Sequence, residues 1–394
     1  MKAAYIAMGA TGHILASLPM IGEMVKKGVE VTYFAPEQYR GKVELMGAKH
    51  SPTPVVAAGE SVDAGDDFIA GIPLVFLGEA AGVIDHIMPV LEADRPDVII
   101  SDSLALAGRL AASKLGLPLV NMYTSFANSE AFSISRFWPK YDDTHPARAK
   151  ALEIARGLQE RFGGPLLTIE QIFDYQGSGD YNVVTVNRGF HPAAETFPGN
   201  FFFAGPQIAP RDGDGSWTAP DNGKPLLYTS LGSLFNNWPE FYTMLFEVVK
   251  DMDINVLCSI GKTIKAEDLG EIPANVQVMA FTPQLEVLSK TDYFITHAGI
   301  GSVMEALYYG VAFVAIPQMD EQEFTAGCMK KLGLASAVLT RATTTVESLR
   351  AALNELVNNP EYKKNARAMA DEIHNEGGCE RVAQAVIDYM NTLN

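Results

Sequence analysis

The chain has little cysteine. Its 394 residues include three cysteines, Cys258, Cys328 and Cys379, which lie far apart and form no Cys-x-x-Cys pair. This spacing excludes a disulfide-stapled scaffold and argues against a structural zinc site. A reducing, cytoplasmic setting is expected instead.

Positive charge is also scarce. The 30 Lys and Arg residues are outnumbered by 47 Asp and Glu residues, and the formal net charge is −17. Nucleic acid and anionic membranes attract basic proteins, so neither is expected as the main partner. A phosphorylated small molecule remains compatible with this charge, because the N–H groups at a helix N-terminus bind anions without a basic side chain.

Long apolar runs and a signal sequence are missing from the pattern as well. No run reads as the roughly 20 apolar residues that a membrane helix needs. The opening MKAAYIAMG lacks the basic segment and the apolar core of a secretory signal. We therefore expect a cytoplasmic protein without stable membrane association.

A strand, a glycine-containing turn and a helix follow one another at the start of each half of the chain. This alternation predicts parallel sheets covered by helices on both faces, and the length exceeds one ordinary core. We expect an α/β protein of two Rossmann-like, doubly wound domains. Strands are predicted at residues 3–7, 30–34, 98–101, 119–123, 182–187, 201–205, 226–230, 255–259, 276–280, 293–296 and 312–316. Helices are predicted at residues 14–27, 104–115, 241–250 and 301–309.

The domain boundary is predicted at residues 209–223, a linker dense in Pro, Gly and Asp without hydrophobic periodicity. The N-terminal domain is then residues 1–208, and the C-terminal domain is residues 224–375. From residue 346 the tail is expected to be helical, with breaks at Pro360 and at the glycine pair 377–378. Two such domains facing each other leave a cleft at the carboxyl ends of their strands, where ligands of open α/β sheets bind.

A glycine-rich turn in the second half has the chemistry of a diphosphate site. The strand at 293–296 ends at His297, and the next residues open a helix whose free N–H groups attract an anion. Gly299 and Gly301 let the backbone approach a ligand closely. Ser302 adds a hydroxyl, and Glu305, one helical turn further on, suits the hydroxyls of a ribose.

This segment resembles the signature of family 1 glycosyltransferases with the GT-B fold, especially their bacterial macrolide and flavonoid branch. That signature runs roughly W-x-P-Q, then H-x-G-x-[GN]-S-x-x-E, then P-x-x-x-[DE]-Q. The chain matches it at Pro283, Gln284, His297, Gly299, Gly301, Ser302, Glu305, Pro317, Glu321 and Gln322. It departs from it at Phe281, where the family has Trp; a phenyl ring can still stack on a base, over a smaller area.

The resemblance implies a nucleotide-sugar donor, a UDP-sugar or a TDP-sugar, and no obligatory cofactor. It implies that His297 and Ser302 contact the diphosphate, that Glu305 contacts the ribose, and that Glu321 and Gln322 hold the sugar. It also implies that the C-terminal helix, residues 376–394, packs back on the N-terminal domain of a monomer or weak dimer. The donor site expected in full is Ser230, Gly232, Ser233, Phe281, Thr282, Gln284, His297, Gly299, Gly301, Ser302, Glu305, Glu321 and Gln322.

The turn from Gly9 to His13 admits two interpretations. It resembles the phosphate turn of short-chain dehydrogenases, so an NAD(P)-dependent oxidoreductase is the alternative function. Against that alternative, Leu15 replaces the third glycine of the fingerprint, and no Tyr is followed four residues later by Lys. In family 1 glycosyltransferases the same place carries Gly-His before a long helix, as Gly12 and His13 do here.

The family resemblance makes His13 the general base that deprotonates the acceptor hydroxyl, a role that suits a side chain titrating near neutrality. Asp102, just past the strand at 98–101, is then the carboxylate that orients the imidazole. Two structural alternatives stay open. His13 can be a helix residue satisfied by backbone, and Asp102 can be the N-cap of the helix at 104–115.

The implied reaction is inverting transfer of a hexose, most simply glucose from UDP-glucose, to an apolar small molecule such as a flavonoid, macrolide or steroid. Phe76, Phe126 and Phe137 are expected to line the acceptor pocket, although each could equally belong to the core. Lipid-linked sugar transfer and nucleotide-sugar epimerisation are the other tasks considered for this fold. The Asp-x-Asp strings beginning at Asp212 and Asp251 are interpreted as solvated turns, so no metal site is expected.

Overall fold

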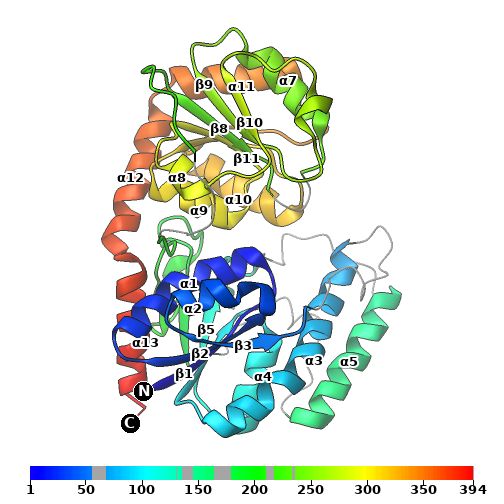
Figure 1. The fold of residues 1–394 in the computed structure, drawn as a ribbon, viewed down its shortest axis with the longest axis vertical. Coiled ribbons are helices and arrows are strands. Elements are labelled where there is room, and N and C mark those ends of the chain that lie inside the picture. The colour runs from blue at the N-terminus through cyan, green and yellow to red at the C-terminus, as the bar shows by residue number, and fades with distance from the viewer. Residues whose placement is uncertain are drawn as a thin grey trace. The chain divides into compact units, whose positions relative to one another are not determined.

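The computed structural model describes residues 1–55, 68–129, 131–134, 145–163, 179–209, 217–232 and 236–393. The chain forms two compact units, one of Met1–Ile208 with Glu376–Asn394 and one of Ala209–Asn375 (Figure 1). Each unit is built on one parallel sheet. The expectation of two doubly wound α/β domains is confirmed.

The first unit contains a seven-stranded sheet in the order β3-β2-β1-β4-β5-β6-β7. Its strands are β1 (Lys2–Ile6), β2 (Glu30–Pro36), β3 (Lys49–Thr53), β4 (Val98–Asp102), β5 (Leu119–Tyr123), β6 (Tyr181–Val184) and β7 (Phe201–Phe203). Its α-helices are α1 (Thr11–Lys26), α2 (Arg40–Leu45), α3 (Phe68–Asp94), α4 (Leu106–Leu115), α5 (Pro146–Phe162) and α13 (Gly378–Asn391). The central strands are buried and mostly apolar because both faces of the sheet are covered.

Alternate residues of β1 point into two separate cores. Tyr5 belongs to the core on the face covered by α1, α2 and α13. Ile6 belongs to the core on the opposite face, covered by α3, α4 and α5. The C-terminal helix α13 lies beside α1 (Figure 1), and Val382, Val386 and Met390 on its inner face are buried in the first of these cores. The last helix of the chain thus completes a core that the first strand begins.

The long helix α3 was not predicted, and it corrects one expectation. Its segment Gly71–Asp94 is long and apolar enough to span a membrane by length and composition, and 50% of its most apolar window is buried. Leu77, Ile84 and Leu91 pack into the core against α4 and α5. These residues place the inner face of α3 in the core of the first unit.

The second unit contains a six-stranded parallel sheet in the order β10-β9-β8-β11-β12-β13. Its strands are β8 (Leu226–Ser230), β9 (Asn255–Ser259), β10 (Val276–Met279), β11 (Tyr293–Thr296), β12 (Ala312–Ala315) and β13 (Ala335–Val338). Its α-helices are α7 (Pro239–Val249), α8 (Gln284–Leu288), α9 (Ile300–Tyr308), α10 (Asp320–Lys331), α11 (Val346–Asn358) and α12 (Glu361–Glu376).

The predicted elements are present, with most ends shifted by a few residues. The breaks expected in the helical tail are confirmed: α11 ends before Pro360, and Gly377 separates α12 from α13 with a φ of 87°. Short elements such as β3 and β13 were missed because strands of this length carry too little pattern to stand out.

Part of the predicted linker is folded onto the second unit. The indole Nε1 of Trp217 donates a hydrogen bond to Gln277 Oε1 at 2.8 Å, and the Trp217 side chain is buried. The amide of Asn222 donates to the side-chain oxygen of Asn255 at 2.9 Å. One buried aromatic residue is enough to anchor a segment that has no hydrophobic periodicity, so composition alone overstated the length of the linker.

Both sheets have a point where the strand order reverses, between β1 and β4 in the first unit and between β8 and β11 in the second. At such a point the chain leaves neighbouring strands in opposite directions, which opens a ligand site at their carboxyl ends. His13 follows β1, and Asp102 ends β4. His297 follows β11, and Gly232 follows β8. All four residues thus lie where this fold binds ligands.

The close packing of α4 on the sheet gives a stability prediction. A Cβ atom on Gly108 would lie 2.3 Å from Ser101 Oγ and 3.2 Å from Ile6 Cβ. We expect Gly108→Ala to destabilise the protein by about 1–3 kcal/mol, the usual cost of overpacking, as measured by urea denaturation. Gly157→Ala in α5 is the control, because its Cβ meets no described atom within 4 Å. Equal stabilities for the two variants would contradict the prediction.

Candidate active site

One group of predicted site residues, called here the first half-site, lies at the carboxyl edge of the first sheet. It joins the start of α1 to the end of β4. His13 lies in the first turn of α1, and Asp102 is the last residue of β4. His13 Nδ1 and Asp102 Oδ2 are 2.8 Å apart, and 24% of the histidine side chain is exposed against 0% of the aspartate. The structure therefore brings together the two residues predicted to form a base and its partner, with the imidazole reaching solvent and the carboxylate shielded from it.

Thr124, which the sequence analysis missed, joins this pair from the loop after β5. Its Oγ lies 2.7 Å from His13 Nδ1 and 3.4 Å from Asp102 Oδ2. A carboxylate accepts a hydrogen bond more strongly than a hydroxyl, so the Nδ1 proton is directed to Asp102. This tautomer leaves the lone pair of His13 on Nε2, as a general base requires. In the sequence, the signal for Thr124 was its position directly after β5, the strand that pairs with β4.

The second carboxylate oxygen of Asp102 has a structural task. Asp102 Oδ1 accepts a hydrogen bond from the Leu104 backbone N–H at 2.9 Å. The N-cap of α4 is Ala105, three residues after Asp102. The alternative interpretation of Asp102 as the N-cap of this helix is therefore wrong. One oxygen of the carboxylate holds the turn that leads to α4, and the other contacts His13.

A second buried carboxyl group, on Glu79 of α3, lies beside this half-site. Glu79 is 8% exposed, and its Oε1 accepts a hydrogen bond from the Gly9 backbone N–H at 2.7 Å. Its Oε2 is shielded from solvent and has no hydrogen-bond partner in the part of the chain that the structure describes. Burial raises the pKa of Glu79 to about 7; the Gly9 N–H and His13 oppose this rise, and Asp102 adds to it. A glutamate within the apolar stretch of residues 71–84 was the sequence signal for this group.

The second half-site lies at the carboxyl ends of β8 and β11, whose residues Ser230 and Thr296 are paired. His297 follows directly, and its backbone N–H donates to the Ser230 carbonyl at 3.3 Å. The loop after β8 reaches the same histidine, because a Cβ on Gly232 would lie 2.7 Å from His297 Nε2. The two loops that were predicted to bind phosphate therefore meet at the His297 ring.

The imidazole of His297 is set for hydrogen bonding without charge. Burial lowers its pKa to about 4, so the ring is neutral at physiological pH. Its Nδ1 is shielded from solvent and has no partner among the described residues. A neutral imidazole still has one N–H to donate, which suits an anionic ligand without titrating near neutral pH.

The N-terminus of α9 adds backbone donors to this half-site. The N-cap is Gly299, which has no side chain to occupy the free N–H groups of the first turn. Ala298, just before it, has a φ of 63°, a left-handed conformation that costs a residue with a Cβ about 1–2 kcal/mol. Such a cost at a helix N-terminus agrees with a turn shaped for a ligand.

Gln284 holds the polar side chains of α9 in place. Its Nε2 donates to Glu305 Oε2 at 2.6 Å and to Ser302 Oγ at 3.2 Å. Tyr228 lies behind it, with its hydroxyl 2.8 Å from Thr282 Oγ1. The predicted diphosphate and ribose contacts, Ser302 and Glu305, are therefore held in one hydrogen-bonded group with Gln284.

The remaining donor residues lie on neighbouring elements of the second unit. The Phe281 ring is 54% exposed, and the Lys262 ammonium lies 5.3 Å from its centroid. Glu321 and Gln322 are half-buried in the first turn of α10, and Gln322 Oε1 accepts from the Gln318 backbone N–H at 2.8 Å. Ser233 lies outside the described residues.

The residues expected to bind the acceptor lie in different settings. Phe126 is 3% exposed and packs against Phe132, Phe190 and His191, a setting that accounts for it as a core residue. Phe76, a residue of α3, is half-buried against the core. Phe137 lies outside the described residues. Among the residues that the structure does describe, no group of three His, Cys, Asp or Glu could hold a metal ion.

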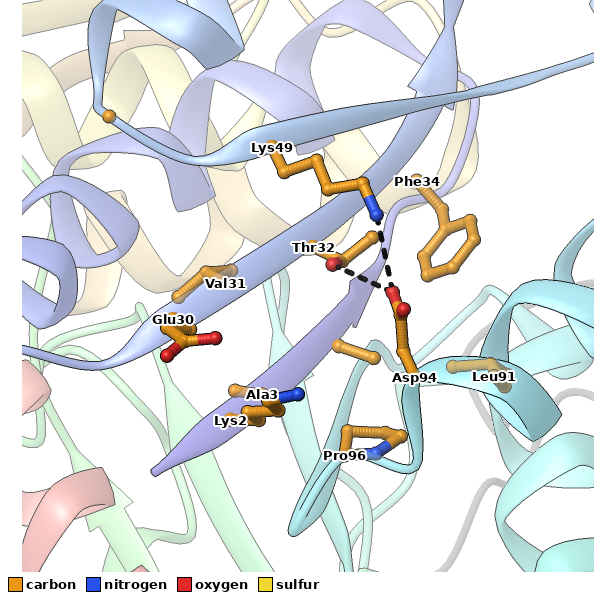
Figure 2. Close-up of a pocket in the computed structure, with 12 residues that line it drawn as sticks. Lys2, Ala3, Glu30, Val31, Thr32, Phe34, Lys49, Leu91, Asp94 and Pro96 are labelled. Atoms are coloured by element: carbon orange, nitrogen blue, oxygen red, sulfur yellow. Dashed lines mark hydrogen bonds and ion pairs between the residues drawn. The ribbon is translucent and has the colours of Figure 1, made fainter.

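A pocket of about 280 Å³ lies elsewhere in the first unit (Figure 2). It is formed by the first residues of β1, β2 and β3 and by the end of α3, where Asp94 faces Lys49 and Thr32. This is the amino end of the sheet, opposite to the edge where His13 and Asp102 lie. Ligands of open α/β sheets bind at the carboxyl edge, so this pocket is not the catalytic site.

Comparison with known proteins agrees with the geometry. Residues 218–390 match the family described as UDP-glucoronosyl and UDP-glucosyl transferase. The chain is 34% identical to the NDP-glycosyltransferase YjiC of Bacillus subtilis (strain 168), over 99% of this chain and 98% of that protein. It is 31% identical to the demethyllactenocin mycarosyltransferase of Streptomyces fradiae, over 98% of this chain and 85% of the relative. The solved glycotransferase of kitacinnamycin superimposes with a TM-score of 0.85 at 29% identity, covering 99% of this chain and 98% of the other.

Crowding around His297 gives a binding prediction. A Cβ on Gly299 would lie 2.4 Å from His297 Nε2, so Gly299→Ala must displace the ring. We expect the affinity for a nucleoside diphosphate such as UDP, measured by calorimetry, to fall about 10- to 100-fold, as for a lost hydrogen bond to a charged group. Gly327→Ala on the exposed side of α10 meets no described atom within 4 Å and serves as the control. Unchanged affinity in Gly299→Ala would rule out the contact.

The buried carboxyl of Glu79 gives a pH-dependent stability prediction. Folding raises the pKa of Glu79 from 4.5 to about 7, so its proton supports the folded state fully below pH 4.5, and that support is lost as pH rises to about 7. Glu79→Gln is neutral at every pH and keeps an acceptor for Gly9. We expect it to exceed the wild type by up to about 3 kcal/mol at pH 8, with the difference shrinking towards pH 4.5. Urea denaturation at several pH values measures this, and a pH-independent difference would argue against a buried acid.

Proposed function

Because the chain belongs to the family 1 glycosyltransferases, which have the GT-B fold and use nucleotide-sugar donors, we propose that it transfers a hexose with inversion to a hydroxyl of an apolar small molecule. Sugar transfer of the macrolide and natural-product type is the activity of the family branch that it matches. The observation that carries the finer proposal is the hydrogen bond between His13 and Asp102. Family membership also removes the dehydrogenase alternative for the turn that follows β1.

His13 is the proposed general base. The Asp102 contact is made by Nδ1 and not by Nε2, and a quarter of the side chain is exposed. As the acceptor oxygen attacks the anomeric carbon, its proton passes to Nε2. The negative charge of Asp102 stabilises the imidazolium that forms, and Asp102 itself stays unprotonated.

The second half-site is the proposed donor site. The α9 N-terminus and the neutral His297 donate hydrogen bonds to the diphosphate, and Ser302 adds its hydroxyl. Glu305, oriented by Gln284, binds the ribose hydroxyls. As the bond between the anomeric carbon and the diphosphate breaks, negative charge grows on the diphosphate. These fixed dipoles stabilise that charge. Glu321 and Gln322 bind the sugar.

UDP-glucose is the proposed donor, and a flat apolar molecule is the proposed acceptor. The matched family is described by its UDP-sugar transferases, and the exposed Phe281 ring can stack on uracil. The mycarosyltransferase relative acts on demethyllactenocin, as its name states, which supports an acceptor of the macrolide kind. Of the acceptors considered, a flavonoid is the flat one, and it shares its apolar character with a macrolide. We propose that the reaction takes place in the cytoplasm.

Substitution of the pair tests the mechanism. We expect His13→Ala and Asp102→Asn each to lower kcat about 10²–10⁴-fold, because the first removes the base and the second allows the wrong tautomer. Hexose adducts formed from UDP-glucose and a small polyphenol are measured by mass spectrometry. UDP affinity should be unchanged in both variants, since the residues proposed to bind the donor belong to the second unit. An equal yield of adduct in His13→Ala would remove it as the base.

A further inference from the structure

His13, Asp102 and Thr124 bring polar groups to the carboxyl edge of the first sheet. A further polar group lies there that has no part in the proposed mechanism. That group is the carboxyl of Glu79, which reaches the edge from the apolar helix α3. A buried carboxyl with one oxygen bonded and the other unpartnered is costly, so its presence needs a cause.

The bonded oxygen holds the turn that precedes the catalytic histidine. Glu79 Oε1 accepts the Gly9 N–H at 2.7 Å, between β1 and α1. The N-cap of α1 is Ala10, whose methyl group cannot cap the helix, so the turn receives its side-chain hydrogen bond from α3 instead. His13 is bonded through its own N–H to the Ala10 carbonyl at 3.1 Å, four residues after Gly9. A shift of the Gly9 turn therefore moves the His13 backbone.

The charge state of Glu79 also bears on His13. The charged groups that face the carboxyl are His13 from α1 and Asp102 from the end of β4. Glu79 also lines a small cavity whose other lining residues, at the end of β1, on α3 and at the start of α4, are apolar: Ile6, Ala7, Ala80, Val83, Ala105, Leu106 and Ala107. A negative charge on Glu79 stabilises the imidazolium of His13 and repels Asp102 across a medium with little water.

We propose that Glu79 is a positioning residue for His13, whose carboxyl fixes the Gly9 turn and whose ionisation sets the proton affinity of the imidazole. The proposal rests on the role of His13 given above. Burial raises the pKa of Glu79 to about 7, which places its change of charge near neutral pH. Glu79 transfers no proton to or from the substrate, because its free oxygen is shielded from solvent.

Two variants of Glu79 separate the hydrogen bond from the charge. Glu79→Ala removes the acceptor for Gly9, and we expect kcat to fall about 10- to 100-fold through misplacement of the base. Glu79→Gln keeps an oxygen acceptor without the charge, and we expect it to restore kcat to within about threefold of the wild type at pH 6. Donor KM should be unchanged in both. A kcat of Glu79→Ala equal to that of the wild type, or Glu79→Gln as slow as Glu79→Ala, would overturn the positioning role.

The pH profile tests the charge. Without a negative charge to stabilise the imidazolium, the rising limb of kcat/KM in Glu79→Gln should move to lower pH than in the wild type. A merely structural residue would lower stability in both variants and leave the position of the limb unchanged. Superimposable profiles for Glu79→Gln and wild type would overturn the coupling.

An NMR titration makes this test independent of turnover. The His13 ring resonance is assigned by its loss in His13→Ala, and its midpoint should fall in Glu79→Gln. If no donor and acceptor pair reacts, the proposed function fails while this midpoint still reports the contact between Glu79 and His13. An unchanged midpoint overturns the inference even in an active enzyme.

Discussion

The first unit depends on one buried charge, the carboxylate of Asp102. A carboxylate cut off from water is tolerated only when its oxygens are bonded, and unpaired it would cost several kcal/mol. Here one oxygen of Asp102 accepts a hydrogen bond from the Leu104 N–H, and the other is hydrogen-bonded to His13 and Thr124. These bonds join the end of β4, the start of α1 and the loop after β5. The hydrogen bonds that satisfy the buried Asp102 carboxylate therefore also orient the imidazole of His13.

The two carboxyl groups near His13 have different surroundings. Asp102 receives a backbone N–H and the histidine, while Glu79 receives one N–H and a wall of apolar side chains. Two negative charges close together in a low dielectric repel strongly, so such a site favours one ionised group and one neutral one. Environments that differ in this way commonly give neighbouring acids separate tasks.

At the proposed donor site, the described residues of the second unit offer hydrogen-bonding dipoles to an anionic ligand. The neutral His297, the N-terminus of α9 and the hydrogen-bonded group around Gln284 are fixed dipoles, already oriented before a ligand arrives. This explains how a chain with a net charge of −17 can belong to a family that uses nucleotide sugars. It also explains the tight packing at Gly232 and Gly299, where any side chain would collide with the His297 ring.

Local pattern determined the two doubly wound domains, the order of most elements and the donor motif, because strand periodicity, glycine turns and the contacts of α9 lie within short stretches of chain. His13 and Asp102 were found through family resemblance, and their contact joins residues 89 positions apart. Only the tertiary structure revealed Thr124, which reaches His13 in α1 across 111 positions, and Glu79, which reaches Gly9 in the preceding turn across 70 positions. It also decided that Trp217 is buried and that Phe126 lies in an aromatic cluster. Such contacts depend on which strands and helices become neighbours, and a side chain carries no local sign of a partner brought to it by folding.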